Sequence, residues 1–168
     1  MRDPSDDLTC QVAWMKLADE VSKNTYHGMQ AGPNCRTFSA VRGKQGGPPK
    51  VRGRGKDLYG LPKLPPNLKK QVAQDNTMAD RCAWIARQLY DRGLPFIIEQ
   101  PKLRPGEPHM FRMRAFRKLR GLKGVKCRSF VQCHLGSLSE KPTTVLYHGI
   151  RLNSNTFKTT CFHFGKWF

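Results

Sequence analysis

Acidic residues and long apolar runs are scarce in this sequence. Asp and Glu together number 12 against 30 Lys and Arg, which gives the 168 residues a formal net charge of +18. No stretch approaches the roughly 20 apolar residues of a membrane-spanning helix, so we expect no membrane association. The opening residues, MRDPSDD, are polar and acidic, whereas a secretory signal begins basic and then becomes apolar. We therefore predict an intracellular protein, located in the nucleus of a eukaryote and otherwise in the cytoplasm.

Cysteine pairs of the CxxC type are also absent. The six cysteines show no dense spacing, which favours reduced thiols over a disulfide framework. A zinc site in the C-terminal part is an alternative, because thiols and imidazoles gather there. These residues are Cys127, Cys133, His134, Cys161 and His163. Their spacings match no common zinc finger or ribbon, so we predict no metal site.

The excess of positive charge predicts a polyanionic partner, and nucleic acid is favoured over a membrane surface. Much of this charge falls in residues 42–70, where glycine and proline are so dense that we expect a basic loop without regular structure. We expect the basic side chains of this loop to contact phosphates, the alternative being a solvated linker. They are Arg42, Lys44, Arg52, Arg54 and Lys56.

Residues 7–23 are expected to form the first helix, capped by Ser5 or Asp6. Apolar residues recur there at helical spacing and form one broad face, which predicts packing against a sheet. The face consists of Leu8, Val12 and Met15, widened by Trp14, Leu17 and Val21.

The stretch 26–39, YHGMQAGPNCRTFS, predicts a short strand that breaks at Gly32-Pro33 and carries Cys35 in the loop beyond its carboxyl end. In an open α/β sheet, ligands bind at that edge. A thiolate is a strong nucleophile, so Cys35 is a candidate catalytic residue. The alternative is a small core residue, since free cysteines are among the most buried side chains.

A helix is expected to follow the basic loop, with Asp75-Asn76 as its cap and Gly93 at its end. Its apolar stripe predicts packing on the core. The stripe consists of Met78, Cys82, Ile85 and Leu89. The apolar run at 96–98 then predicts a buried strand of a parallel sheet, which ends near Glu99 and Pro101.

A residue with a nucleophilic or ionisable side chain lies at the end of each predicted strand. A right-handed crossover brings the carboxyl ends of two parallel strands to the same edge of a sheet. We therefore expect Cys35 and Glu99 to face one pocket. Alternatively, Glu99 is an ordinary carboxylate at a strand end that pairs with one of the many Lys and Arg residues.

The remainder is strongly basic. Residues 109–124 predict a short helix whose apolar face, Met110, Met113 and Phe116 or Leu119, meets the core while arginines line the rest. Such a helix suits a DNA or RNA backbone, and the alternative is a solvated charged face. Residues 126–136 and 143–150 then predict two strands that form a hairpin at the sheet edge.

Three segments, taken in order, resemble cytosine 5-methyltransferases of the type found in phages and mobile elements. AGPNCRTFS, at 31–39, is similar to the catalytic G-P-P-C-x-x-F-S segment, and FIIEQP, at 96–101, resembles the E-N-V or E-N-P segment. GSLSEKPTT, at 136–144, is similar to Y-G-x-x-x-x-K-P-T. The order and spacing agree over about residues 25–150.

The resemblance implies a mechanism and a partner. Cys35 would add to C6 of cytosine, and Glu99 would hold the N3 and amino edge of the base. The base would leave the duplex to reach them, and DNA is favoured over RNA as the substrate. The residues expected to contact nucleic acid are Arg36, Ser39, Arg42, Lys44, Arg52, Arg54, Lys56, Arg112, Arg114, Arg117 and Lys141.

The chain also departs from the family pattern. Asn34 stands where the family usually has proline, and Gln100 where it usually has asparagine. The family binds S-adenosylmethionine through a Gly-rich loop upstream of the cysteine, but only 34 residues precede Cys35 and they contain no strand followed by Gly-x-Gly. We therefore expect the cofactor site to be supplied by a missing N-terminal segment or by a second chain.

These observations predict one α/β domain over residues 1–168, incomplete at its N-terminus. It would contain a partial Rossmann-like methyltransferase sheet, flanking helices and a C-terminal β-hairpin. The expected function is DNA cytosine 5-methylation or, in a truncated or inactive copy, its catalytic part. The alternative is a non-catalytic basic domain that binds nucleic acid.

Overall fold

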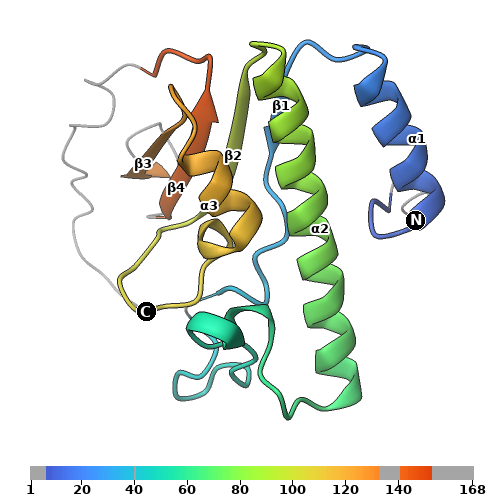
Figure 1. The fold of residues 1–168 in the computed structure, drawn as a ribbon. Coiled ribbons are helices and arrows are strands. Elements are labelled where there is room, and N and C mark those ends of the chain that lie inside the picture. Colours follow the sequence, from blue (N-terminus) through green and yellow to red (C-terminus); the bar gives the residue numbers. More distant parts are fainter. Residues whose placement is uncertain (1–6, 40, 133–140, 153–168) are drawn as a thin grey trace.

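The computed structural model describes residues 7–39, 41–132 and 141–152 (Figure 1). These residues form a mixed α/β structure with three α-helices and an open four-stranded sheet. The predicted α/β class is therefore confirmed. Among the described residues, no helix is both long enough and apolar enough to cross a membrane.

The sheet has the strand order β1-β2-β4-β3. β1 (Met29–Ala31) and β2 (Phe96–Pro101) are parallel, as the crossover between them predicted. β4 (Pro142–His148) pairs antiparallel with β2, and β3 (Lys126–Val131) pairs antiparallel with β4 at the edge of the sheet. The predicted antiparallel strand pair at the sheet edge is thus confirmed.

The long helix α2 (Pro66–Asp91) connects β1 to β2 and runs beside both strands (Figure 1). Gly93 terminates α2 as predicted, two residues after its last helical residue. It adopts a φ of 70°, and the N–H of Leu94 donates to the carbonyl of Leu89 at 2.9 Å. This 6→1 hydrogen bond is the Schellman arrangement, which favours glycine. The predicted stripe of α2 also faces the core, with Cys82, Ile85 and Leu89 buried.

The start of α2 and the loop before it differ from the prediction. The helix begins at Pro66, because proline suits the first helical position, and Asp75 lies within the helix rather than at its cap. Residues 42–70 are also not wholly irregular. They contain a 3₁₀ helix, η2 (Gly55–Tyr59), as well as the first residues of α2.

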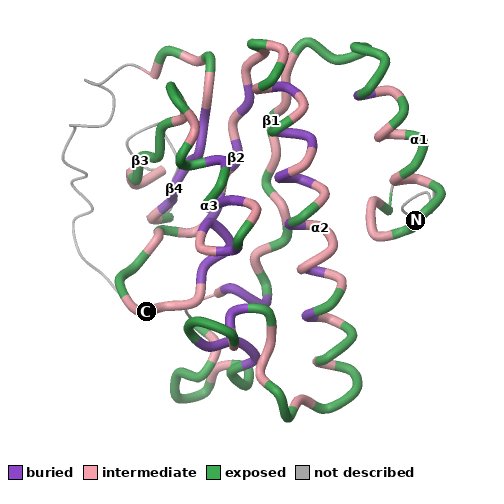
Figure 2. Tube along the Cα trace, viewed as in Figure 1, coloured by how far each residue is buried: buried purple, intermediate pink, exposed green. Residues whose placement is uncertain are grey.

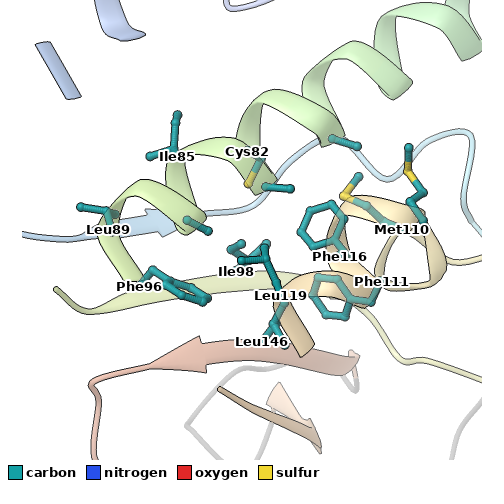
Figure 3. Close-up of a cluster of buried hydrophobic side chains, with 14 of the residues drawn as sticks. Cys82, Ile85, Leu89, Phe96, Ile98, Met110, Phe111, Phe116, Leu119 and Leu146 are labelled. Atoms are coloured by element: carbon teal, nitrogen blue, oxygen red, sulfur yellow. The ribbon is translucent and has the colours of Figure 1, made fainter. Parts of the chain in front are cut away.

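The core lies between the sheet and the helices α2 and α3 (Figure 3). α3 (Arg114–Arg120) follows a short 3₁₀ helix, η3 (Met110–Arg112), and the predicted apolar face of this region is fully buried. The largest fully buried apolar side chains are Phe96, Phe111, Phe116, Leu89, Ile98, Met110, Met113 and Leu146. Buried residues occur on β2, β4 and α3 and along one face of α2, whereas the first turn of α2 is mostly exposed (Figure 2).

A buried histidine fixes the segment between β2 and η3. The ring of His109 lies 2.7 Å from the carbonyl of Pro101 through Nε2 and accepts the N–H of Phe111 at 3.0 Å through Nδ1. Because Nδ1 is an acceptor, Nε2 carries the proton and the imidazole is neutral. Burial lowers the pKa of His109 to about 4.

The first helix, α1 (Gln11–Ser22), packs on α2 and not on the sheet. Trp14 meets Trp84 edge to face, with the ring centroids 5.3 Å apart. Only part of the predicted broad face packs against the core, because Val12 and Met15 point outward and are 77% and 61% exposed. The packing surface consists of Trp14, Leu17 and Val21. The predicted caps Ser5 and Asp6 lie outside the described residues.

Candidate functional site

An open groove of about 1210 Å³ runs along β1 and reaches the carboxyl ends of β1 and β2. Its walls come from α1, α2, the loop after β1 and the end of β2. Cys35, Glu99 and Lys141 all line this groove, so the structure brings together the three residues that the catalytic segments supply. We call it the cysteine groove.

The pairing of β1 with β2 explains this proximity. Ala31, the last residue of β1, is in register with Ile98, so the chain leaves β1 beside Glu99, the next residue of β2. Gly32 lies beside Glu99, since a Cβ atom at Gly32 would be 3.8 Å from the Oε2 atom of the carboxylate.

The two departures from the family pattern each form a local hydrogen bond. Asn34 accepts the N–H of Arg36 at 3.0 Å through its side-chain oxygen. Gln100 donates from Nε2 to the carbonyl of Pro33 at 2.7 Å. Both contacts fix the loop that carries Cys35.

The carboxylate of Glu99 is paired and partly exposed. Lys141 Nζ lies 2.9 Å from Oε1, and Gln132 donates to the same atom at 3.3 Å. The side chains of Glu99 and Lys141 are 35% and 52% exposed, so the ion pair contributes little to stability. The alternative that Glu99 pairs with a basic residue is therefore observed, and a ligand in the groove could exchange for this partner.

The thiol of Cys35 is half-buried, and burial raises its pKa above the ordinary value of 9.0. The positive charge of Lys141 opposes this effect, whereas Glu99 and Asp75 add to it. At neutral pH the thiol is therefore mostly protonated. A nucleophilic role requires that a ligand or a base shift this balance.

A buried polar network lies directly beneath the loop of Cys35. The hydroxyl of Thr37 donates to Asp75 Oδ2 at 2.5 Å and accepts two N–H groups of Arg52, at 3.1 and 2.9 Å. Arg52 also donates to the carbonyl of Leu58 and to Asn76 Oδ1, both at 2.7 Å. The hydroxyl thus uses all of its hydrogen-bonding capacity.

Charge and packing complete this network. Arg36 Nε lies 3.1 Å from Asp75 Oδ1, so the buried carboxylate has two partners. Arg52 is fully buried with its guanidinium 3.8 Å from the ring centroid of Phe38, and burial lowers its pKa to about 10. The network joins the loop after β1, residues 52–58 and α2, and it fixes Cys35 from below.

Sequence analysis missed this role of Arg52, Thr37 and Asp75. Arg52 was expected to contact phosphate, but a fully buried guanidinium does not reach a ligand at the surface. Asp75 and Asn76 were expected to cap a helix, but their side chains bind Arg36, Thr37 and Arg52 instead. No spacing pattern links these residues, because they lie far apart in the chain.

The other predicted nucleic-acid contacts divide by position. Arg36 lies at the cysteine groove, whereas Arg42 holds its own loop through Arg36, Pro49 and Gln71. Ser39 accepts the N–H of Val41 at 3.3 Å. Lys44 and Lys56 are exposed, Lys141 lines the cysteine groove, and the remaining four line a second cleft. These four are Arg54, Arg112, Arg114 and Arg117.

The zinc alternative falls largely on residues outside the described part of the chain. Cys127 lies exposed on β3. Within 7–39, 41–132 and 141–152, no cluster of metal-ligating side chains occurs. The other four residues of the alternative, Cys133, His134, Cys161 and His163, are not described.

Among the described residues, no strand is followed by the Gly-x-Gly turn that the resemblance implies for S-adenosylmethionine. The first strand among them is β1, and it is followed by Gly32, Pro33 and Asn34 instead of a Gly-x-Gly turn. Gly32, Pro33 and Asn34 line the cysteine groove together with Cys35.

No protein family, curated protein or solved structure matches this chain. A functional proposal for it therefore depends on the residues of the two clefts.

Proposed function

We propose that this chain acts on nucleic acid as the catalytic part of a cytosine 5-methyltransferase-like protein. Its sheet would be part of a Rossmann-like fold, with Cys35 as the nucleophile and Glu99 as the residue that holds the base. One observation carries the proposal: a thiol and a carboxylate from consecutive parallel strands line the same groove.

The proposed chemistry begins with the Cys35 thiolate, which adds to C6 of a cytosine placed in the groove. The C5=C6 electron pair moves toward C5, and C5 takes a proton from water. Loss of the original hydrogen from C5 with expulsion of the thiolate then restores the ring. Glu99 would hold the N3 and amino edge of the base and stabilise the charge that develops there.

S-adenosylmethionine would supply the methyl group in a complete enzyme. The described residues contain no strand followed by a Gly-x-Gly turn, so we limit the proposed chemistry to the addition at C6 and the hydrogen exchange at C5 that follows it. This step needs only Cys35, Glu99 and a base that has left the stack, at a cost of a few kcal/mol. The strong positive charge of the chain supports a grip on the phosphate backbone.

The test is hydrogen exchange at C5 without cofactor. DNA that carries tritium at C5 of cytosine is incubated with the chain, and tritium released into water is counted. We expect release by the wild type, no release by C35A, and reduced release by E99Q. C127A removes an exposed thiol on β3 and serves as the matched control, with release like the wild type.

The pH profile sharpens the test. Because burial raises the pKa of Cys35, release should increase as the pH rises above neutrality. DNA that binds to the wild type without any release, or release that persists in C35A, would exclude the proposed chemistry.

The second candidate is a non-catalytic domain that binds nucleic acid. The raised pKa of Cys35 favours it, because a protonated thiol is a weak nucleophile. DNA binding that decreases with salt and is the same in C35A, with no tritium release, would establish this function instead.

A further inference from the structure

A second cleft, of about 840 Å³, opens between η2, α3 and the segment before η3. It shares no lining residue with the cysteine groove. We call it the arginine cleft, and its cationic and aromatic lining consists of Arg54, Tyr59, Arg112, Arg114, Arg117 and Lys118.

Positive charge predominates in the arginine cleft. Its described lining contains five cationic side chains and one acidic side chain, that of Glu107. In the part of the chain that the structure describes, none of the five forms a salt bridge. Like charges gathered in a concave site raise the local potential and attract an anion.

Two of the arginines are held in place by backbone carbonyls. Arg54 Nε donates to the carbonyl of Gly106 at 2.7 Å, and Arg112 Nη2 donates to that of Arg104 at 2.8 Å. Arg54 approaches Gly106 so closely that a Cβ atom there would lie 2.1 Å from Nη2. Each guanidinium keeps further N–H groups for a ligand, and its position costs little entropy on binding.

Tyr59 adds a hydroxyl and an aromatic surface. Its oxygen accepts the backbone N–H of Arg114 at 2.7 Å, which leaves the phenolic proton to donate to a ligand. The residue is 41% exposed, so its ring offers a surface on which a base or sugar can stack.

The arginines on η3 and α3 extend from segments whose apolar side chains are packed in the core. The residues of α3 and η3 that alternate with the arginines are fully buried in the core, among them Phe111, Met113 and Phe116. Arg114 and Arg117 are therefore presented by an anchored helix, and both side chains are exposed. Replacing them should change the surface charge without loss of the fold.

We propose that the arginine cleft binds the phosphodiester backbone of a nucleic acid, at a place separate from the cysteine groove. Planar guanidinium groups match phosphate oxygens in pairs, and phosphate contacts position a nucleic acid without reading its sequence. This inference depends on the proposal that nucleic acid is the partner, and it assigns the backbone contacts to one defined surface.

The experiment measures binding of a fluorescein-labelled duplex of about two helical turns as a function of salt. The variant R114Q/R117Q removes two positive charges from the cleft. The control K16Q/K23Q removes two exposed charges from α1, far from the cleft. Because each lost duplex phosphate contact reduces the slope of log K against log salt by about 0.9, the cleft variant should reduce it by about 2.

The outcomes separate this inference from the proposed function. A slope and affinity for R114Q/R117Q equal to those of K16Q/K23Q would overturn the inference, whereas tritium release would still report on Cys35. Competition by poly-glutamate that is as strong as competition by unlabelled duplex, and that depends on the same two arginines, would overturn it in favour of an acidic protein partner. A reduced slope in the cleft variant supports the inference even where Cys35 releases no tritium.

Discussion

Replacing Thr37 by valine tests the buried network beneath Cys35. The substitution keeps the shape of the side chain and removes only the hydroxyl. That hydroxyl donates to Asp75 and accepts two N–H groups of Arg52, and it is 1% exposed. The change therefore leaves two buried charged groups short of partners without opening a cavity.

The magnitude follows from what each partner retains. Hydrogen bonds to charged groups contribute roughly 1.5–3 kcal/mol each, so three of them set an upper limit. Asp75 keeps its contact with Arg36, and Arg52 keeps those with Leu58 and Asn76. We therefore expect a loss of about 3 kcal/mol, which for a chain of this size lowers Tm by roughly 10 °C.

Urea denaturation followed by circular dichroism measures this loss. Thr25→Val is the matched control, because Thr25 is exposed and its hydroxyl has no buried partner among the described residues. The control should stay within about 0.5 kcal/mol of the wild type. A T37V protein as stable as T25V would mean that the network does not stabilise the fold, and that Arg52 is not held as described.

Two further predictions concern protonation. Burial lowers the pKa of His109 from 6.5 to about 4. As the pH falls between these values, His109 gains a proton in the unfolded state but not in the folded state. The free energy of unfolding should therefore decrease by about 3 kcal/mol from pH 7 to pH 4. H109Q should lose this part of the pH dependence in urea denaturation, and an unchanged profile would contradict it. Lys141 lowers the pKa of Cys35, and Glu99 raises it. Alkylation of Cys35 by iodoacetamide at a fixed pH should therefore be slower in K141Q and faster in E99Q than in the wild type. Rates that change in the same direction in both variants would contradict the electrostatic argument.

Sequence patterns predicted the elements that local periodicity determines. The apolar run at Phe96, the stripe on α2 and the basic helix with a buried face all reflect the repeat of a strand or helix, and the structure confirms them. The proximity of Cys35 and Glu99 also followed from a general rule, because parallel strands joined by a helix end at the same edge.

The rest depended on contacts that no local pattern encodes. Arg52 is a basic residue in a basic stretch, yet it alone is fully buried, because Thr37 and Asn76 supply its partners from distant segments. Val12 and Met15 have the spacing of a packing face, but the edge-to-face pair of tryptophans rotates α1 so that both point outward. Which of these side chains is buried therefore depends on contacts between segments that are distant in the chain.

If the chain binds nucleic acid as proposed, the buried position of Arg52 has a consequence for the length that it would cover. Arg52 binds Thr37, which lies two residues after Cys35 of the cysteine groove, and Arg52 itself lies two residues before Arg54 of the arginine cleft. The buried network of Arg52 is therefore close in the chain to residues of both clefts. A strand gripped at one cleft would present its nucleotides to the other at a fixed offset, so the footprint would be set by the protein and would not vary with sequence.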